Sequence, residues 1–150
     1  MIAQLQAIAC LLASEPIPSD EFAKYLGVVT QSSGDLIIVQ PYDSQLPPLA
    51  IQVSRKIDEK TNQPLIIPKF VNLDLTEPIP VSRLVQAFGM YKPVRAHVPG
   101  KPPIVSKNGV NSLIFYIKVP GHSQQIKMSA SVKDNRAINI FLERRKNRDI

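Results

Sequence analysis

The stretch LIFYIKVPGHSQQIKMSASVKDNRAINIFL, residues 113–142, decides the fold. Core-type apolar residues recur at every second position in three runs, 113–119, 126–132 and 138–142, and this period of two is typical of strands with one buried face. Residues that favour turns, Pro120-Gly121 and Asp134-Asn135, separate the runs. The stretch therefore predicts a three-stranded antiparallel meander with one apolar face.

The residues that precede the meander predict further strands and one helix. Short apolar runs with turn residues at their ends predict strands at 36–39, 49–53 and 65–73. Pro68 interrupts the last of these, which indicates an edge strand or a bulge and not a central strand, because proline donates no hydrogen bond. Helical spacing of apolar residues then predicts a helix over 81–88.

The N-terminal residues predict a helical hairpin over residues 1–30. Apolar residues at helical spacing indicate one amphipathic helix over 2–13, and a second is predicted from Ser19, a typical N-cap, to Gly27, a typical C-terminal glycine. Residues 11–28, LLASEPIPSDEFAKYLGV, resemble the first two helices of winged-helix domains in the bacterial segregation-and-condensation family. The resemblance ends at Val28, because a β run follows where that family has its recognition helix.

The combined pattern is that of an α+β protein with a small antiparallel sheet or barrel, an N-terminal helical hairpin and one helix inserted between strands. The chain of 150 residues has the usual length of a single domain, residues 1–150. We divide it into the hairpin 1–30, a β-rich body 34–142 and a basic tail 143–150. The order strand-strand-strand-helix-strand-strand is also that of the OB-fold, so an OB-like barrel is the alternative to an open sheet.

The positive charge is concentrated in the last third of the chain. Residues 1–100 carry 8 Lys and Arg against 9 Asp and Glu, a balance of −1, whereas residues 101–150 carry 10 against 3, a balance of +7. Locally concentrated charge attracts polyanions more effectively than the same charge spread over a surface. Residues 92–110, rich in proline, contribute further cations. The charge pattern therefore favours nucleic acid or another polyanion as partner.

The cysteine content and the hydropathy indicate the compartment. Cys10 is the single cysteine, so no internal disulfide can form, and the cytoplasm or another reducing compartment is predicted. Its apolar neighbours predict that Cys10 is buried. Residues 1–13 lack the basic residues that open a signal peptide. No apolar run approaches the 18 residues of a transmembrane helix, although peripheral membrane contact stays open.

Catalytic and metal-binding patterns are weak. The two histidines, His97 and His122, lie in separate turn-rich stretches without a ligand motif around them. The adjacent carboxylates Asp20-Glu21 and Asp58-Glu59 suit a helix start and a solvated turn. The sequence therefore predicts a protein that is not an enzyme and that binds no metal or cofactor.

The face of the meander opposite its apolar side carries the predicted binding site. Aromatic rings beside cations suit single-stranded DNA or RNA, because bases stack on rings while cations neutralise phosphates. Whether the N-terminal helices cover these rings stays open at this point. The predicted binding residues are Tyr116, Lys118, Lys127, Lys133, Arg136, Phe141, Arg144, Arg145 and Lys146.

The leading hypothesis is a non-catalytic nucleic-acid-binding accessory protein. The alternative is a self-assembling structural protein, such as a viral matrix, coat or scaffold subunit, that contacts an anionic membrane or a genome. Strand edges and apolar helices would then form contacts between copies of the chain, which makes a homo-oligomer part of this alternative.

Overall fold

The computed structural model of the chain describes residues 2–14, 16–19, 21–22, 24, 26–42, 46–93, 111–121 and 125–144. These residues form two helices and nine strands. In chain order the elements are α1 (Ile2–Ala13), β1 (Ile17–Pro18), β2 (Gly27–Ser33), β3 (Leu36–Pro41), β4 (Leu49–Ile57), β5 (Pro64–Pro80), α2 (Val81–Phe88), β6 (Lys92–Pro93), β7 (Asn111–Lys118), β8 (Gln125–Lys133) and β9 (Arg136–Arg144).

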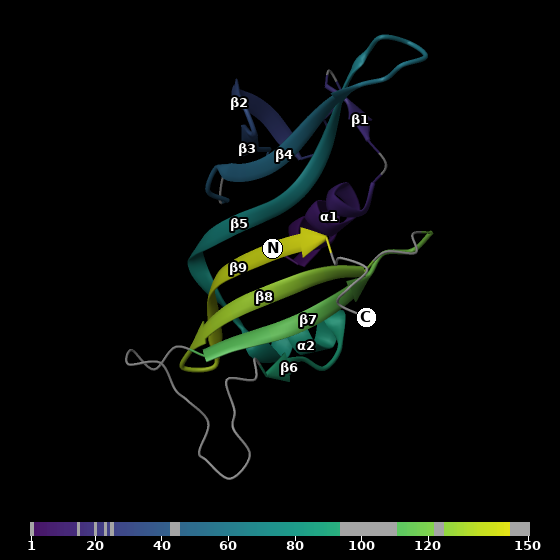
Figure 1. The fold of residues 1–150 in the computed structure, drawn as a ribbon. Coiled ribbons are helices and arrows are strands. Elements are labelled where there is room, and N and C mark those ends of the chain that lie inside the picture. The colour runs from purple at the N-terminus through teal and green to yellow at the C-terminus, as the bar shows by residue number, and fades with distance from the viewer. Residues whose placement is uncertain are drawn as a thin grey trace.

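One antiparallel sheet contains every described strand (Figure 1). Its path runs β2-β3-β4-β5-β9-β8-β7-β6, and β1 pairs separately with β5. The long strand β5 joins the two halves, since it pairs with β4 over 64–72 and with β9 over 70–80. The path ends at β2 and β6, so the sheet is open. The prediction of an antiparallel α+β fold is confirmed, whereas the closed OB-like barrel is not observed.

Pro68 lies within β5 at a β-bulge. Gln52 of β4 pairs with Phe70 and the next residue, Val53, pairs with Pro68, so Lys69 is the extra residue on β5. A bulge tolerates a residue that lacks a backbone donor, because the ladder is interrupted there in any case. The predicted bulge is therefore observed, whereas the expectation that this is not a central strand is wrong, because β5 lies in the middle of the sheet.

The meander and the helix that precedes it form as predicted. β7, β8 and β9 pair in sequence order, and α2 ends at Gly89, whose φ is 88°. Asp134 and Asn135 have φ angles of 53° and 61°, as a two-residue turn of type I′ requires. The Asn135 carbonyl also accepts a hydrogen bond of 3.0 Å from the Val81 N–H, which joins this turn to the first turn of α2.

The prediction of a second helix in the N-terminal hairpin is wrong. The described residues between Ser19 and Leu26 form turns, and Gly27 begins β2 and not the end of a helix. A Cβ atom on Gly27 would lie 2.0 Å from the Gln40 carbonyl oxygen, so the close approach of β3 requires glycine at this position. The resemblance to winged-helix domains therefore does not extend beyond α1.

Both helices pack on the same face of the lower half of the sheet. α1 lies against β5, β8 and β9, and α2 lies against β5 and β7. In Figure 1 the helices are behind β7, β8 and β9, so the opposite face of these strands is toward the viewer. Buried side chains of both helices and of the strands form one core cluster, of which the largest fully buried members include Leu5, Leu84, Phe115, Met128 and Ile140.

The position of Cys10 differs from the one that the sequence predicts. Cys10 is exposed on α1, because it points away from the sheet while Leu5, Ile8 and Leu12 point toward it. The prediction that Cys10 is buried is therefore wrong.

Neither α1 nor α2, the helices of the described residues, is long and apolar enough to cross a membrane.

Candidate nucleic-acid interface

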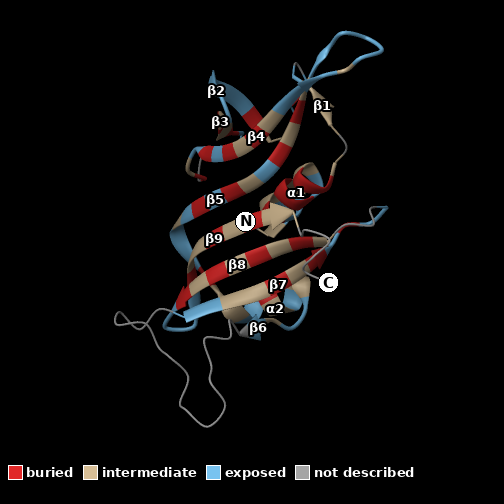
Figure 2. Cartoon of the chain, in the orientation of Figure 1, coloured by how far each residue is buried: buried red, intermediate tan, exposed pale blue. Residues whose placement is uncertain are grey.

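The face of β7, β8 and β9 opposite the helices carries the side chains of interest. Along β8, Ile126, Met128, Ala130 and Val132 are buried while the intervening residues are partly or fully exposed, as the alternating colours of Figure 2 show. Since α1 and α2 both pack on the buried side, neither helix covers the other side. We call this side of the sheet, on which neither described helix packs, the open face.

Strand register aligns the side chains of the open face in rows that cross the sheet. Two adjacent rows contain all the aromatic residues of this face. The first row is Phe70, Glu143, Lys127 and Tyr116, and the second is Asn72, Phe141, Ser129, Ile114 and Lys92.

The rings of the open face form two separate platforms. Phe70 of β5 and Phe141 of β9 are in contact, with ring centroids 5.1 Å apart and a tilt of 40°. Tyr116 of β7 lies under the ammonium of Lys92, whose Nζ is 5.5 Å from the ring centroid. This geometry is that of a cation–π interaction. All three residues are partly exposed. Because the Lys92 ammonium lies over the Tyr116 ring, a base that stacks on Tyr116 must displace this ammonium.

Acidic groups lie between and beside these platforms. The Lys127 ammonium and the Glu143 carboxylate form an ion pair of 3.8 Å, with side chains 28% and 34% exposed. Asp74 and Asn139 are partners in the row next to that of Phe141, and the Asp74 carboxylate accepts a hydrogen bond of 2.6 Å from the Asn139 side chain. The open face is therefore a mixture of cations, carboxylates and amides, and not a uniformly positive surface.

The structure brings four of the predicted binding residues together. Tyr116, Lys127 and Phe141 lie at the centre of the open face, and Lys118 lies two residues beyond Tyr116 on the same side of β7. Lys133 and Arg136 pair with each other at the β8–β9 hairpin. Lys133 is eight residues along β8 from Gln125, the partner of Lys118, which corresponds to about 26 Å at ~3.3 Å per residue.

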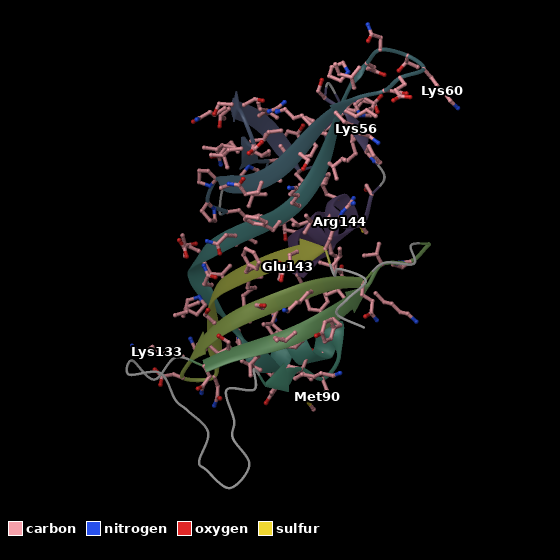
Figure 3. The ribbon with its side chains drawn as sticks, in the orientation of Figure 1. Lys56, Lys60, Met90, Lys133, Glu143 and Arg144 are labelled. Atoms are coloured by element: carbon pink, nitrogen blue, oxygen red, sulfur yellow. The ribbon has the colours of Figure 1, made fainter. Side chains whose placement is uncertain are left out.

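Arg144 does not join this group, because it lies on the helix side of β9. Its guanidinium donates hydrogen bonds to the Leu12 and Ser14 carbonyls at the C-terminal end of α1. Its neighbour Glu143 is on the open face, as alternation along a strand requires, and Figure 3 labels both residues near the end of β9. The predicted residues Arg145 and Lys146 lie outside the described residues.

Phe70, Asp74, Lys92 and Glu143 of the open face were not among the predicted binding residues. Phe70 lies on the open face because the bulge at Pro68 and the register with β9 determine the side of the sheet to which it belongs. Lys92 lies on this face because the short strand β6 pairs with β7. Neither pairing has a local signal in the sequence. Glu143 did have one, since it alternates with Leu142 in the same period that placed Phe141.

Comparisons with known proteins provide no identification: no protein family, no curated protein sequence and no solved structure matches this chain. In the part of the chain that the structure describes, no three His, Cys, Asp or Glu side chains lie close enough to hold a metal ion. His97 and His122 are outside the described residues. The geometry of the open face is therefore the feature of the molecule from which a function can be inferred.

Proposed function

We propose that the chain is a non-catalytic nucleic-acid-binding accessory protein whose ligand lies on the open face. The observation that carries this proposal is the pair of partly exposed ring platforms on a sheet surface that neither helix covers. Rings on the face of a sheet are a common way to bind unpaired bases, since every base has a flat surface that can stack.

The lysines near the rings support the same proposal. Lys92, Lys118 and Lys127 lie on or beside the rows that contain the rings, within reach of the phosphates that flank a stacked base. Lysine binds phosphate as a point charge and does not require a fixed direction of approach. A sheet that stacks bases and neutralises a few phosphates would bind single strands with little preference for sequence.

Fluorescence anisotropy with a labelled single strand of about 12 nucleotides tests the proposal. Three lysines that each neutralise one phosphate predict a slope of about −2 for log K against log salt, from about −0.7 per phosphate on single strands. We expect measurable binding at about 50 mM salt and a clear loss of affinity at about 200 mM.

A matched pair of lysine variants provides the control. Lys118→Gln removes a cation from the open face, whereas Lys60→Gln removes one from the tip of the β4–β5 hairpin (Figure 3), where Lys60 is exposed. The first variant should lower the affinity several-fold and reduce the salt slope, and the second should leave both within twofold. Equal effects of the two variants, or no binding of the wild-type chain, would rule out a site on this face.

Strand β2 supports self-assembly as a second candidate function. It ends the sheet path, has no charged residue, and exposes Val28 and Val29 by 58% and 40%. Such an edge can pair with another strand, and lacks the lysines and prolines that usually prevent pairing. The Tyr42 N–H donates to the Leu26 carbonyl across this hairpin, so by alternation the Val29 N–H points to the outer edge.

Val29→Pro removes that donor and leaves the ladder with β3 intact. If copies of the chain pair through β2, light scattering should show oligomers of the wild-type chain that dissociate in the variant. A wild-type chain that stays monomeric up to about 1 mM, or a Val29→Pro variant that assembles as the wild type does, would exclude this contact.

A further inference from the structure

The two ring platforms of the open face are too far apart to receive stacked neighbouring bases. Phe141 and Tyr116 are separated by two strand spacings of about 4.8 Å across the sheet and by one two-residue step of about 6.6 Å along it. Their Cα atoms are therefore about 12 Å apart. Stacked bases of one strand are about 3.4 Å apart, so a gap of this size corresponds to more than three stacked steps.

This spacing restricts the ligand that can use both platforms. In a duplex the bases remain stacked and present only their edges in the grooves. Rings that lie on a sheet need the flat surfaces of bases that have left the stack. A ligand that fills both platforms must therefore be a single strand with two bases turned apart.

Glu143 is placed to reject ligands that offer phosphates alone. It lies between the platforms in the row Phe70, Glu143, Lys127 and Tyr116, and it pairs with Lys127 at 3.8 Å. A phosphate that approaches Lys127 must compete with this carboxylate and is repelled by it. Asp74, hydrogen bonded to Asn139, adds a second negative charge on the other side of Phe141.

We propose that the open face selects single strands with two separated, unstacked bases, one on Tyr116 and one on Phe141, and that Glu143 is the residue that determines this selectivity. The inference rests on the proposed function, because it describes the same site. We expect the affinity of the chain for a strand to depend more strongly on the bases than on the phosphates.

Three probes of equal length test the selectivity: an oligothymidine, an abasic deoxyribose-phosphate strand and a DNA duplex. The wild-type chain should bind the oligothymidine at least about tenfold more tightly than either of the other two. Tyr116→Leu and Phe141→Leu remove a ring and retain apolar bulk, so the fold is preserved. Each should lower the affinity for oligothymidine by about five- to 150-fold, the range for one stacked base, and should leave the abasic strand within twofold.

Glu143→Gln tests the role of the carboxylate. It should raise the affinity for the abasic strand by about fivefold or more, and so reduce the difference between the two single strands. Glu59→Gln, which removes an exposed carboxylate from the turn of the β4–β5 hairpin, is the matched control and should change neither affinity by more than twofold. Thermal melts of each variant verify that it is folded.

The outcomes separate this inference from the proposed function. If the wild-type chain binds no strand at about 50 mM salt, the proposed function fails. If it binds the oligothymidine and the abasic strand equally well, or if Glu143→Gln has no more effect than Glu59→Gln, nucleic-acid binding survives and selection through the rings and Glu143 is overturned.

Discussion

Replacement of Arg144 should reduce the stability of the fold and leave nucleic-acid binding intact. The guanidinium donates to the Leu12 and Ser14 carbonyls, at the end of α1 where helix carbonyls lack partners within the helix. A hydrogen bond with a charged group contributes about 1.5–3 kcal/mol, and a cation near a helix C-terminus about 0.3–1 kcal/mol. Because these bonds are only partly buried, we take about 2 kcal/mol for the sum.

Arg144→Met retains the apolar stem of the side chain and removes both donors. A loss of about 2 kcal/mol lowers the melting temperature of a chain of this size by about 4–8 °C, which circular dichroism can measure. Arg144→Lys keeps the charge and loses the planar fork, so it should recover less than half of this loss. Affinity for oligothymidine, measured at about 15 °C, should stay within twofold. A variant that melts like the wild type and binds as weakly as Lys118→Gln would show that Arg144 contacts the ligand and not α1.

Substitutions at three further positions test the fold by urea denaturation. Gly27→Ala places a Cβ atom 2.0 Å from the Gln40 carbonyl oxygen and should cost about 2–3 kcal/mol, whereas a cost below about 0.5 kcal/mol would show that β2 and β3 do not approach so closely. Met128→Ala empties a fully buried position and should cost about 2–5 kcal/mol, with Lys60→Gln unchanged as its control. Asn135 has a φ of 61°, so Asn135→Gly should leave the stability unchanged, whereas Asn135→Val should lower the free energy of unfolding by about 1–2 kcal/mol. Equal stability of the two variants would contradict the type I′ turn.

Elements with strong local patterns could be predicted from the sequence. Buried residues alternate with partly or fully exposed ones along β8 from Gln125 to Val132, along β7 from Phe115 to Lys118 and along β9 from Asn139 to Glu143, and the residues between β8 and β9 are suited to a tight turn. α2 combines helical spacing with a proline before it and a glycine after it. In these segments the local preference and the tertiary structure agree, so the period of the apolar residues suffices.

The segment from Ser19 to Gly27 shows where local patterns are insufficient. Its residues fit an amphipathic helix, but Gly27 begins β2 because it pairs with Pro41 of β3, which lies outside the segment and follows β2 after a short turn. The contact that decides the structure, Gly27 against Gln40, has no sign within the segment itself. Closure of a barrel likewise depends on whether the two ends of the sheet meet, and the order of strands does not determine this.

The side of the sheet on which residues lie was predicted better than the distribution of charge on the proposed binding face. Alternation correctly placed Tyr116, Lys127 and Phe141 on one face, because the three strands pair without a shift in register around these residues and the bulge of the β8–β9 ladder comes only at Ser131/Val132. The same alternation places Arg144 on the side of Leu142, but Arg144 was predicted to bind nucleic acid because it begins a run of basic residues. Phe70 and Lys92 could not be predicted, since strand pairing places them there.

The described cations of the last third do not form one positive patch. Lys127 lies at the centre of the open face and Lys118 beyond it, whereas Lys133 and Arg136 are at the hairpin, about 20 Å from Lys127 and about 26 Å from the row of Lys118, and Arg144 donates hydrogen bonds to the end of α1. Few phosphates can therefore be neutralised together, and charge alone should give only weak binding with a shallow salt slope. Tight binding on this face would have to come from the rings, so the effect of Tyr116→Leu and Phe141→Leu decides more about this protein than any removal of charge.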